Sequence, residues 1–155
     1  MKRVLSLLLI IVLLVTNAFL FSSCKIGASE GLVFTLNKDR ETVTLVGTSN
    51  CVDADVVIPA RFNGKKVTAI GDDAFCDHIY VRSITIPASV VSIGKNVLNP
   101  TGYTVSFRIY LEKIRYKGTM EQWKDIVGIN YVYPDVPVIC KDGTLYKDGS
   151  NWVEK

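Results

Sequence analysis

The 155-residue sequence is poor in the side chains from which catalytic and metal sites are usually built. It contains one histidine, His78, and four cysteines, none of them in a Cys-x-x-Cys pair. A structural zinc site needs four suitably spaced ligands of this kind, and a hydrolytic nucleophile needs a base beside it. No glycine-rich phosphate-binding loop occurs either. We therefore expect no catalysis, no metal and no cofactor, and we interpret His78 as a solvated loop residue.

The sequence also lacks a strong excess of charge. It has 18 basic and 15 acidic residues, and without Lys2 and Arg3 the formal net charge falls from +3 to +1. Proteins that bind nucleic acid carry a clustered basic face. The nearest approach to one is the pair Lys65-Lys66, which we interpret as a solvated hairpin tip. Nucleic acid is therefore not an expected partner.

The longest hydrophobic run lies at the N-terminus and is too short for a stable membrane span. Lys2 and Arg3 precede an apolar run from Val4 to Val15 that is broken only by Ser6. Twelve residues span about 18 Å as a helix, and a short apolar run behind two positive charges is typical of a signal peptide. We assign residues 1–23 to this signal peptide.

The end of the signal segment resembles a bacterial lipobox. Ser22 and Ser23 are small residues directly before Cys24, although Phe21 stands where leucine is commoner. The resemblance implies that Cys24 is acylated and becomes the first mature residue, so that a lipid anchors an exported protein to the cell envelope or cell surface. Simple secretion is the alternative. Residues 24–31 then form a mostly polar tether.

Three cysteines remain in the mature chain: Cys51, Cys76 and Cys140. An odd number leaves at least one thiol unpaired within the chain. We interpret them as thiols that fill small spaces in the core. One disulfide stays open as an alternative in an exported protein.

After the tether the sequence is rich in short β-prone runs. Residues 32–36 and 42–46 flank a polar turn and predict a hairpin. Ile58-Pro59 then recurs 28 residues later as Ile86-Pro87, and Ile70-Gly71 recurs 23 residues later as Ile93-Gly94. Two weaker units follow at 111–116 and 136–140. One unit cannot bury its apolar face alone, but stacked units share a continuous core.

These repeats resemble the BspA-like leucine-rich repeats of bacterial surface proteins. The residues that carry the resemblance are the entry from Gly31-Leu32 to Ala74-Phe75, the repeat Ser83 to Gly94, and the terminal segment Tyr116 to Trp123 followed by Val138 to Leu145. It implies a mainly β fold: a short leucine-rich-repeat-type β-solenoid over residues 32–146, with an N-terminal hairpin and a C-terminal tail over 147–155. Two departures are Val97-Leu98 in place of Ala-Phe and a long loop over 99–109.

One short helix is expected near the C-terminus, where it would cap the end of the solenoid. Thr119 and Gln122 have the spacing of a capping box. Trp123, Ile126 and Val127 fall on one apolar stripe, and Gly128 suits the end of the helix.

The predicted function is an exported, surface-anchored module that binds a protein or a glycan. The first candidate for a binding surface is the atypical loop with Tyr103, Phe107 and Tyr110, because loops on rigid scaffolds often carry function. The alternative for these aromatic rings is packing in the core. The alternative function is a passive structural envelope lipoprotein, or the remnant of a larger repeat array.

Overall fold

The computed structural model describes residues 27–75, 81–97, 111–132 and 136–154. This part of the chain contains one α-helix, α2 (Met120–Lys124), and one 3-10 helix, η1 (Ile129–Tyr131). No described helix is long and apolar enough to cross a membrane. The strands are β1 (Leu32–Leu36), β2 (Thr42–Thr48), β3 (Asp55–Val57), β4 (Arg61–Phe62), β5 (Lys65–Ile70), β6 (Ser83–Ile86), β7 (Ser92–Ile93), β8 (Lys113–Tyr116), β9 (Val138–Ile139), β10 (Thr144–Asp148) and β11 (Asn151–Glu154).

The predicted N-terminal hairpin is confirmed. Strands β1 and β2 pair antiparallel, and the turn between them is held by Asp39. Its carboxylate accepts hydrogen bonds from the backbone N–H of Glu41 at 2.9 Å, and from the backbone N–H and hydroxyl of Thr42 at 3.0 and 2.6 Å. These bonds, with that of the Thr42 hydroxyl foremost, lower the pKa of Asp39.

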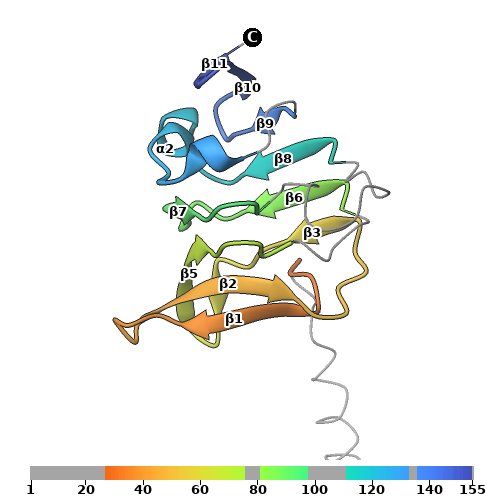
Figure 1. Cartoon of the computed structure of the whole chain (residues 1–155), viewed down its shortest axis with the longest axis vertical. Coiled ribbons are helices and arrows are strands. Elements are labelled where there is room, and N and C mark those ends of the chain that lie inside the picture. The colour runs from red at the N-terminus through yellow and green to blue at the C-terminus, as the bar shows by residue number, and fades with distance from the viewer. Residues whose placement is uncertain (1–26, 76–80, 98–110, 133–135, 155) are drawn as a thin grey trace, which may run out of the picture.

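Two parallel ladders build the rest of the fold. In the first, β3, β6, β8 and β9 lie in that order, which aligns the buried residues Val56, Ile84, Ile114 and Val138. In the second, β5 lies between β2 and β7, and Val127 continues the ladder through a bridge to Ser92. Figure 1 shows the strands stacked from β1 and β2 at the bottom to β10 and β11 at the top.

The chain alternates between the two ladders, so it winds as a solenoid around one interior. Leu45, Ile70 and Ile93 line that interior from the second ladder and face the residues of the first. The predicted repeats are therefore confirmed: the register places Val57 beside Thr85 and Ile70 beside Ile93, with the spacings read from the sequence. In the weaker third unit, Tyr116 takes the position of Ile86.

A tight turn separates β4 from β5. Asn63 and Gly64 both have positive φ, at 48° and 78°, which is the geometry of the turn that best joins two antiparallel strands. The β4–β5 hairpin is inserted into the first full repeat. Phe75 closes that repeat on the inside, with 1% of its side chain exposed.

The helix near the C-terminus forms as predicted at its start but ends earlier. The capping box of Thr119 and Gln122 is present, and Trp123 is fully buried. The predicted helical stripe and the stop at Gly128 were wrong, because the helix ends at Lys124. Ile126 and Val127 both lie beyond it, and Ile126 is buried while Val127 is 71% exposed. Gly128 instead precedes the 3-10 helix η1. Val127 instead extends the second ladder, where its neighbour is Ser92.

The C-terminal end of the solenoid carries a further hairpin. Strands β10 and β11 pair antiparallel and extend the first ladder beyond β9. Strand β11 lies in the segment that the sequence analysis assigned to a tail, and its Trp152 is buried. The helix and this hairpin cover the last turn together (Figure 1).

Cys51 and Cys140 are free thiols in the structure. Both are half-buried and pack against the core, so they fill space there without being fully enclosed. Cys76 lies outside the described residues.

Candidate functional site: a groove along the parallel ladder

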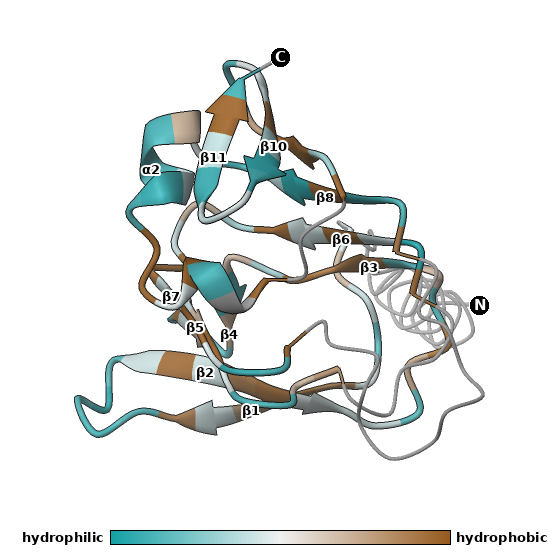
Figure 2. Ribbon diagram, turned by 45° about the horizontal axis from the view of Figure 1, so that its top comes forward, coloured by the Kyte–Doolittle hydropathy of each residue, from teal (hydrophilic) through white to brown (hydrophobic). Residues whose placement is uncertain are grey.

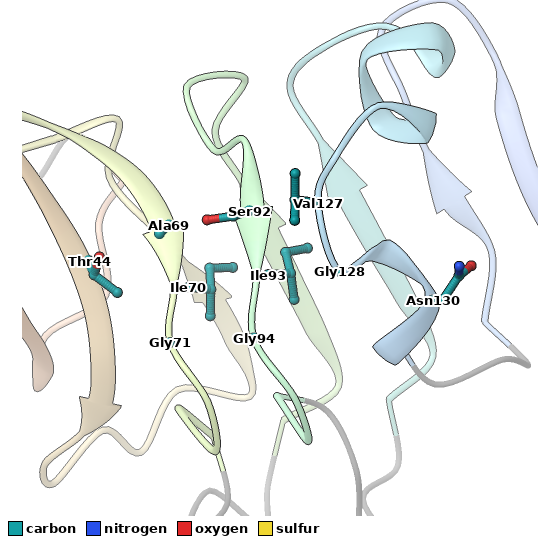
Figure 3. A pocket seen from close by; sticks show the side chains of 10 residues that line it. All are labelled: Thr44, Ala69, Ile70, Gly71, Ser92, Ile93, Gly94, Val127, Gly128 and Asn130. Atoms are coloured by element: carbon teal, nitrogen blue, oxygen red, sulfur yellow. The ribbon is translucent and has the colours of Figure 1, made fainter.

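A shallow groove with a volume of about 510 Å³ runs across the outward face of the second ladder. Figure 3 shows Thr44, Ala69, Ser92 and Val127 side by side, each from a successive turn of the chain. We call this feature the ladder groove. Its lining residues are Thr44, Ala69, Ile70, Gly71, Ser92, Ile93, Gly94, Val127, Gly128 and Asn130.

Strand alternation explains why these side chains face outward. Leu45 is buried in β2, so its neighbour Thr44 points to the other face of the sheet. The register of β2 and β5 shifts between Val43 and Thr44, and this irregularity pairs Thr44 with Ala69. A bulge of this kind re-aims side chains, and here it places a small residue in the groove.

At Gly94, successive turns of the solenoid stack closely, and this keeps the groove shallow. A Cβ atom on Gly94 would lie 2.5 Å from the backbone nitrogen of Asp72 and 2.6 Å from the carbonyl carbon of Gly71. Only glycine fits so close to the preceding turn. The floor of the groove at this point is therefore bare backbone.

The rim of the ladder groove mixes apolar and polar groups. Val127 is 71% exposed, and its backbone N–H donates at 3.0 Å to the carbonyl of Val91, a 60% exposed residue outside the lining of the groove. The hydroxyl of Thr44 donates to Asn37 at 2.7 Å, and this bond fixes its rotamer. Asn130 is exposed at the far end. The groove can therefore cover small apolar side chains and offer hydrogen bonds beside them.

A second hollow, of about 380 Å³, lies at the opposite corner near the start of the described chain. Three carboxylates line it, from Glu30, Asp53 and Asp55. Across the described ranges, no group of three or more metal-ligating side chains is placed to hold an ion.

The site residues named from the sequence lie outside the described residues. These are Cys24, Tyr103, Phe107 and Tyr110, together with His78, and their roles stay predictions. Sequence reasoning missed the ladder groove. Its signal was the small residue before each Ile-Gly pair, in Ala69-Ile70-Gly71 and Ser92-Ile93-Gly94.

No model of a known protein family matches the sequence, and no curated protein matches it. Three solved structures are similar to parts of it. One is a leucine-rich cell surface protein from Faecalibacterium prausnitzii, with 28% identity and a TM-score of 0.44 over 57% of this chain and 22% of that one.

The other two are leucine-rich repeat proteins. That of T. pallidum has 21% identity and a TM-score of 0.42, over 56% of this chain and 41% of that one. The protein of Bacteroides capillosus has 24% identity and a TM-score of 0.37, over 57% of this chain and 71% of that one. The chain thus spans less than half the length of the first two proteins.

The repeat lengths decide the fold. Val56, Ile84, Ile114 and Val138 follow one another at intervals of 28, 30 and 24 residues in one parallel ladder, close to the 20–29 residues of leucine-rich repeats. The chain is a short leucine-rich-repeat-type β-solenoid. In this solenoid the ladder groove crosses four successive segments of the second ladder, at Thr44, Ala69, Ser92 and Val127.

Proposed function

We propose that the solenoid is an exported, surface-anchored binding module that holds a linear protein or glycan ligand in the ladder groove and does not convert it. The observation that carries this proposal is the row of Thr44, Ala69, Ser92 and Val127 across four consecutive chain segments. Such a row offers repeated contacts to an extended ligand.

The groove is held ready for binding by the fold. Its side chains stand on strands whose opposite faces are buried in the core, so little conformational freedom remains to be lost on binding. The exposed side chain of Val127 lines the groove, and Val91, which is also exposed, is joined to Val127 by a backbone hydrogen bond. Contiguous exposed apolar surface of this kind is typical of interaction sites.

The test uses the full-length chain in a mild detergent, applied to arrays of peptides and of glycans. Ser92→Tyr places a ring in the groove, and Ser150→Tyr is the matched control at an exposed turn. We expect at least one ligand whose affinity falls about 10-fold or more with Ser92→Tyr and is unchanged with Ser150→Tyr. Failure of every array feature to bind would contradict the proposal and favour a passive structural role in the envelope.

Anchoring rests on Cys24 and is tested separately. Mass spectrometry of the membrane fraction from a bacterial host should find a mature N-terminal Cys24 carrying a diacylglyceryl group, and Cys24→Ala should abolish it. A mature protein found in the medium with an unmodified Cys24, or cleaved beyond it, would show simple secretion instead.

A further inference from the structure

A basic cluster lies beside the ladder groove, along the strands that carry Thr44 and Ala69. It consists of Lys38 and Arg40 in the β1–β2 turn, Arg61 in β4, and Lys65 and Lys66 in β5. Five bases stand here against two acids, Asp39 and Glu41, which gives a formal net charge of +3. The remaining 13 bases and 13 acids of the chain balance. The whole formal excess of positive charge is therefore gathered at these two hairpin tips.

Specific contacts bring four members of the cluster together. Arg61 lies directly opposite Lys66 in the antiparallel β4–β5 ladder, and Thr42 flanks Lys66 on its other side. The ammonium group of Lys65 donates to the backbone carbonyl of Arg40 at 2.5 Å, which joins the two hairpin tips. The guanidinium of Arg61 donates to the carbonyl of Gly64 at 2.7 Å.

The positive charges of the cluster are only partly offset from within, because the carboxylate of Asp39 interacts electrostatically with Lys65. Among the described residues, no carboxylate forms an ion pair with Arg61 or Lys66. The Asp39 carboxylate is turned into its own loop by three hydrogen bonds. Two like charges directly opposite each other destabilise a sheet. The repulsion between Arg61 and Lys66 therefore lowers the stability of the β4–β5 hairpin. An anionic ligand would offset that repulsion.

The basic cluster and the ladder groove share one face. Lys66 and Ala69 both lie in β5, three residues apart, or about 10 Å along a strand. Strand β2 repeats the arrangement, because Thr42 pairs with Lys66 and Thr44 with Ala69. Figure 2 shows the tip of the β1–β2 hairpin as hydrophilic at one edge of the molecule. One extended ligand can therefore contact both regions.

We infer that the ladder groove and the basic cluster together bind an extended acidic polypeptide, with its carboxylates over the cluster and small apolar side chains beside Val127. This inference rests on the proposed function and names the class of its ligand. A polypeptide fits better than an acidic glycan, because a glycan offers charge but no apolar side chains to cover Val91 and Val127, which are 60% and 71% exposed.

The test measures binding of a fluorescein-labelled peptide, Glu-Glu-Glu-Glu-Gly-Val-Ser-Val-Ser, to the full-length chain by fluorescence anisotropy. The comparison ligands are the same peptide with Gln for each Glu, and polygalacturonate as an acidic glycan. The test variant is Arg61→Glu with Lys66→Glu. The matched control is Lys117→Glu with Lys141→Glu, two exposed lysines near the other end of the solenoid. Circular dichroism verifies that both variants fold.

We expect the Glu peptide to bind, the Gln peptide to bind about 10-fold or more weakly, and the cluster variant to lose a similar factor. The control variant should stay within about 2-fold, and raising salt from about 50 to 500 mM should weaken binding by screening. Equal binding of the Gln peptide, or polygalacturonate binding more tightly through the cluster, would overturn the inference. Absence of Glu-peptide binding would also overturn it. The proposed function would still stand if Ser92→Tyr weakened an array ligand.

Discussion

The indole of Trp152 stands edge-on to the indole of Trp123, with ring centroids 5.5 Å apart and planes at 90°. Trp123 also contacts Tyr116, at 5.3 Å and 59°. Strand β8, helix α2 and strand β11 thus meet in one aromatic cluster, which closes the C-terminal end of the core. The geometry is one of the arrangements that aromatic pairs prefer.

The aromatic cluster predicts that the last hairpin contributes strongly to stability. Trp152→Ala should lower the free energy of unfolding by about 3–5 kcal/mol, because it removes a buried ring and leaves a cavity. Trp152→Phe should lower the free energy of unfolding by less, since a buried aromatic ring remains. Urea denaturation of the full-length chain followed by circular dichroism measures both, with Asn151→Ala as the exposed control. A Trp152→Ala variant as stable as the control would show that the hairpin is only loosely attached.

The close stacking of turns predicts that Gly94 cannot be replaced. Gly94→Ala should destabilise the chain by about 1–3 kcal/mol, because its Cβ would clash with the backbone and carboxylate of Asp72. Gly47→Ala is the matched control, since a Cβ at Gly47 meets nothing within 4 Å. It should change stability by no more than about 0.5 kcal/mol. Similar unfolding midpoints for the two variants would contradict the stacking.

A polar chain across three turns makes a further prediction. The Ser83 hydroxyl donates to the carboxylate of Asp55 and accepts from the guanidinium of Arg115 at 3.2 Å. Ser83 is 1% exposed, so water cannot easily replace it. Ser83→Ala should therefore cost about 1–2 kcal/mol in unfolding free energy, and Ser150→Ala nearly nothing. Equal stability of the two variants in the same urea titration would contradict this prediction.

Cys140 should react slowly with alkylating reagents. Burial, assisted by the negative charge of Asp142, raises the pKa of this thiol to about 11. Since the thiolate is the reactive form, only about 0.1% is reactive at pH 8. Its rate of alkylation by iodoacetamide, followed by peptide mass spectrometry, should rise about 10-fold per pH unit from 7 to 10. A plateau near pH 9 would indicate an exposed, unshifted thiol.

The sequence predicts the ladders well because their signals are local and repeated. Ile-Pro and Ile-Gly pairs mark where strands end and turn, and the structure places them at the expected spacing. Thr119 and Gln122 gave the helix start for the same reason, since a capping box is a local pattern. The ladder groove on the outward face of the second ladder could not be predicted from such local patterns. Ala69 reaches the groove only through a bulge in the β2–β5 register, which depends on the partner strand.

Val127 shows a second limit of sequence reasoning. Its spacing from Trp123 fits a helical stripe, yet the helix ends at Lys124 and Val127 joins a β-ladder instead. Tertiary pairing overrides the helical pattern, because the backbone of Val127 can satisfy its hydrogen bonds with Val91 and Ile93. Lys65 and Lys66 were correctly placed at a hairpin tip. Their proximity to Arg40 and Arg61 required the fold.

Backbone NMR of the isotope-labelled chain tests the stacked solenoid most directly. Nuclear Overhauser effects should connect the backbone of Ala69 with that of Ser92, and Ile84 with Ile114, because parallel neighbours lie about 4.8 Å apart. Ser92 should show a further contact with Val127. Observation of these three sets of contacts is the predicted result. Their absence in a folded chain, with the same residues paired antiparallel or not at all, would contradict the shared interior and the groove built upon it.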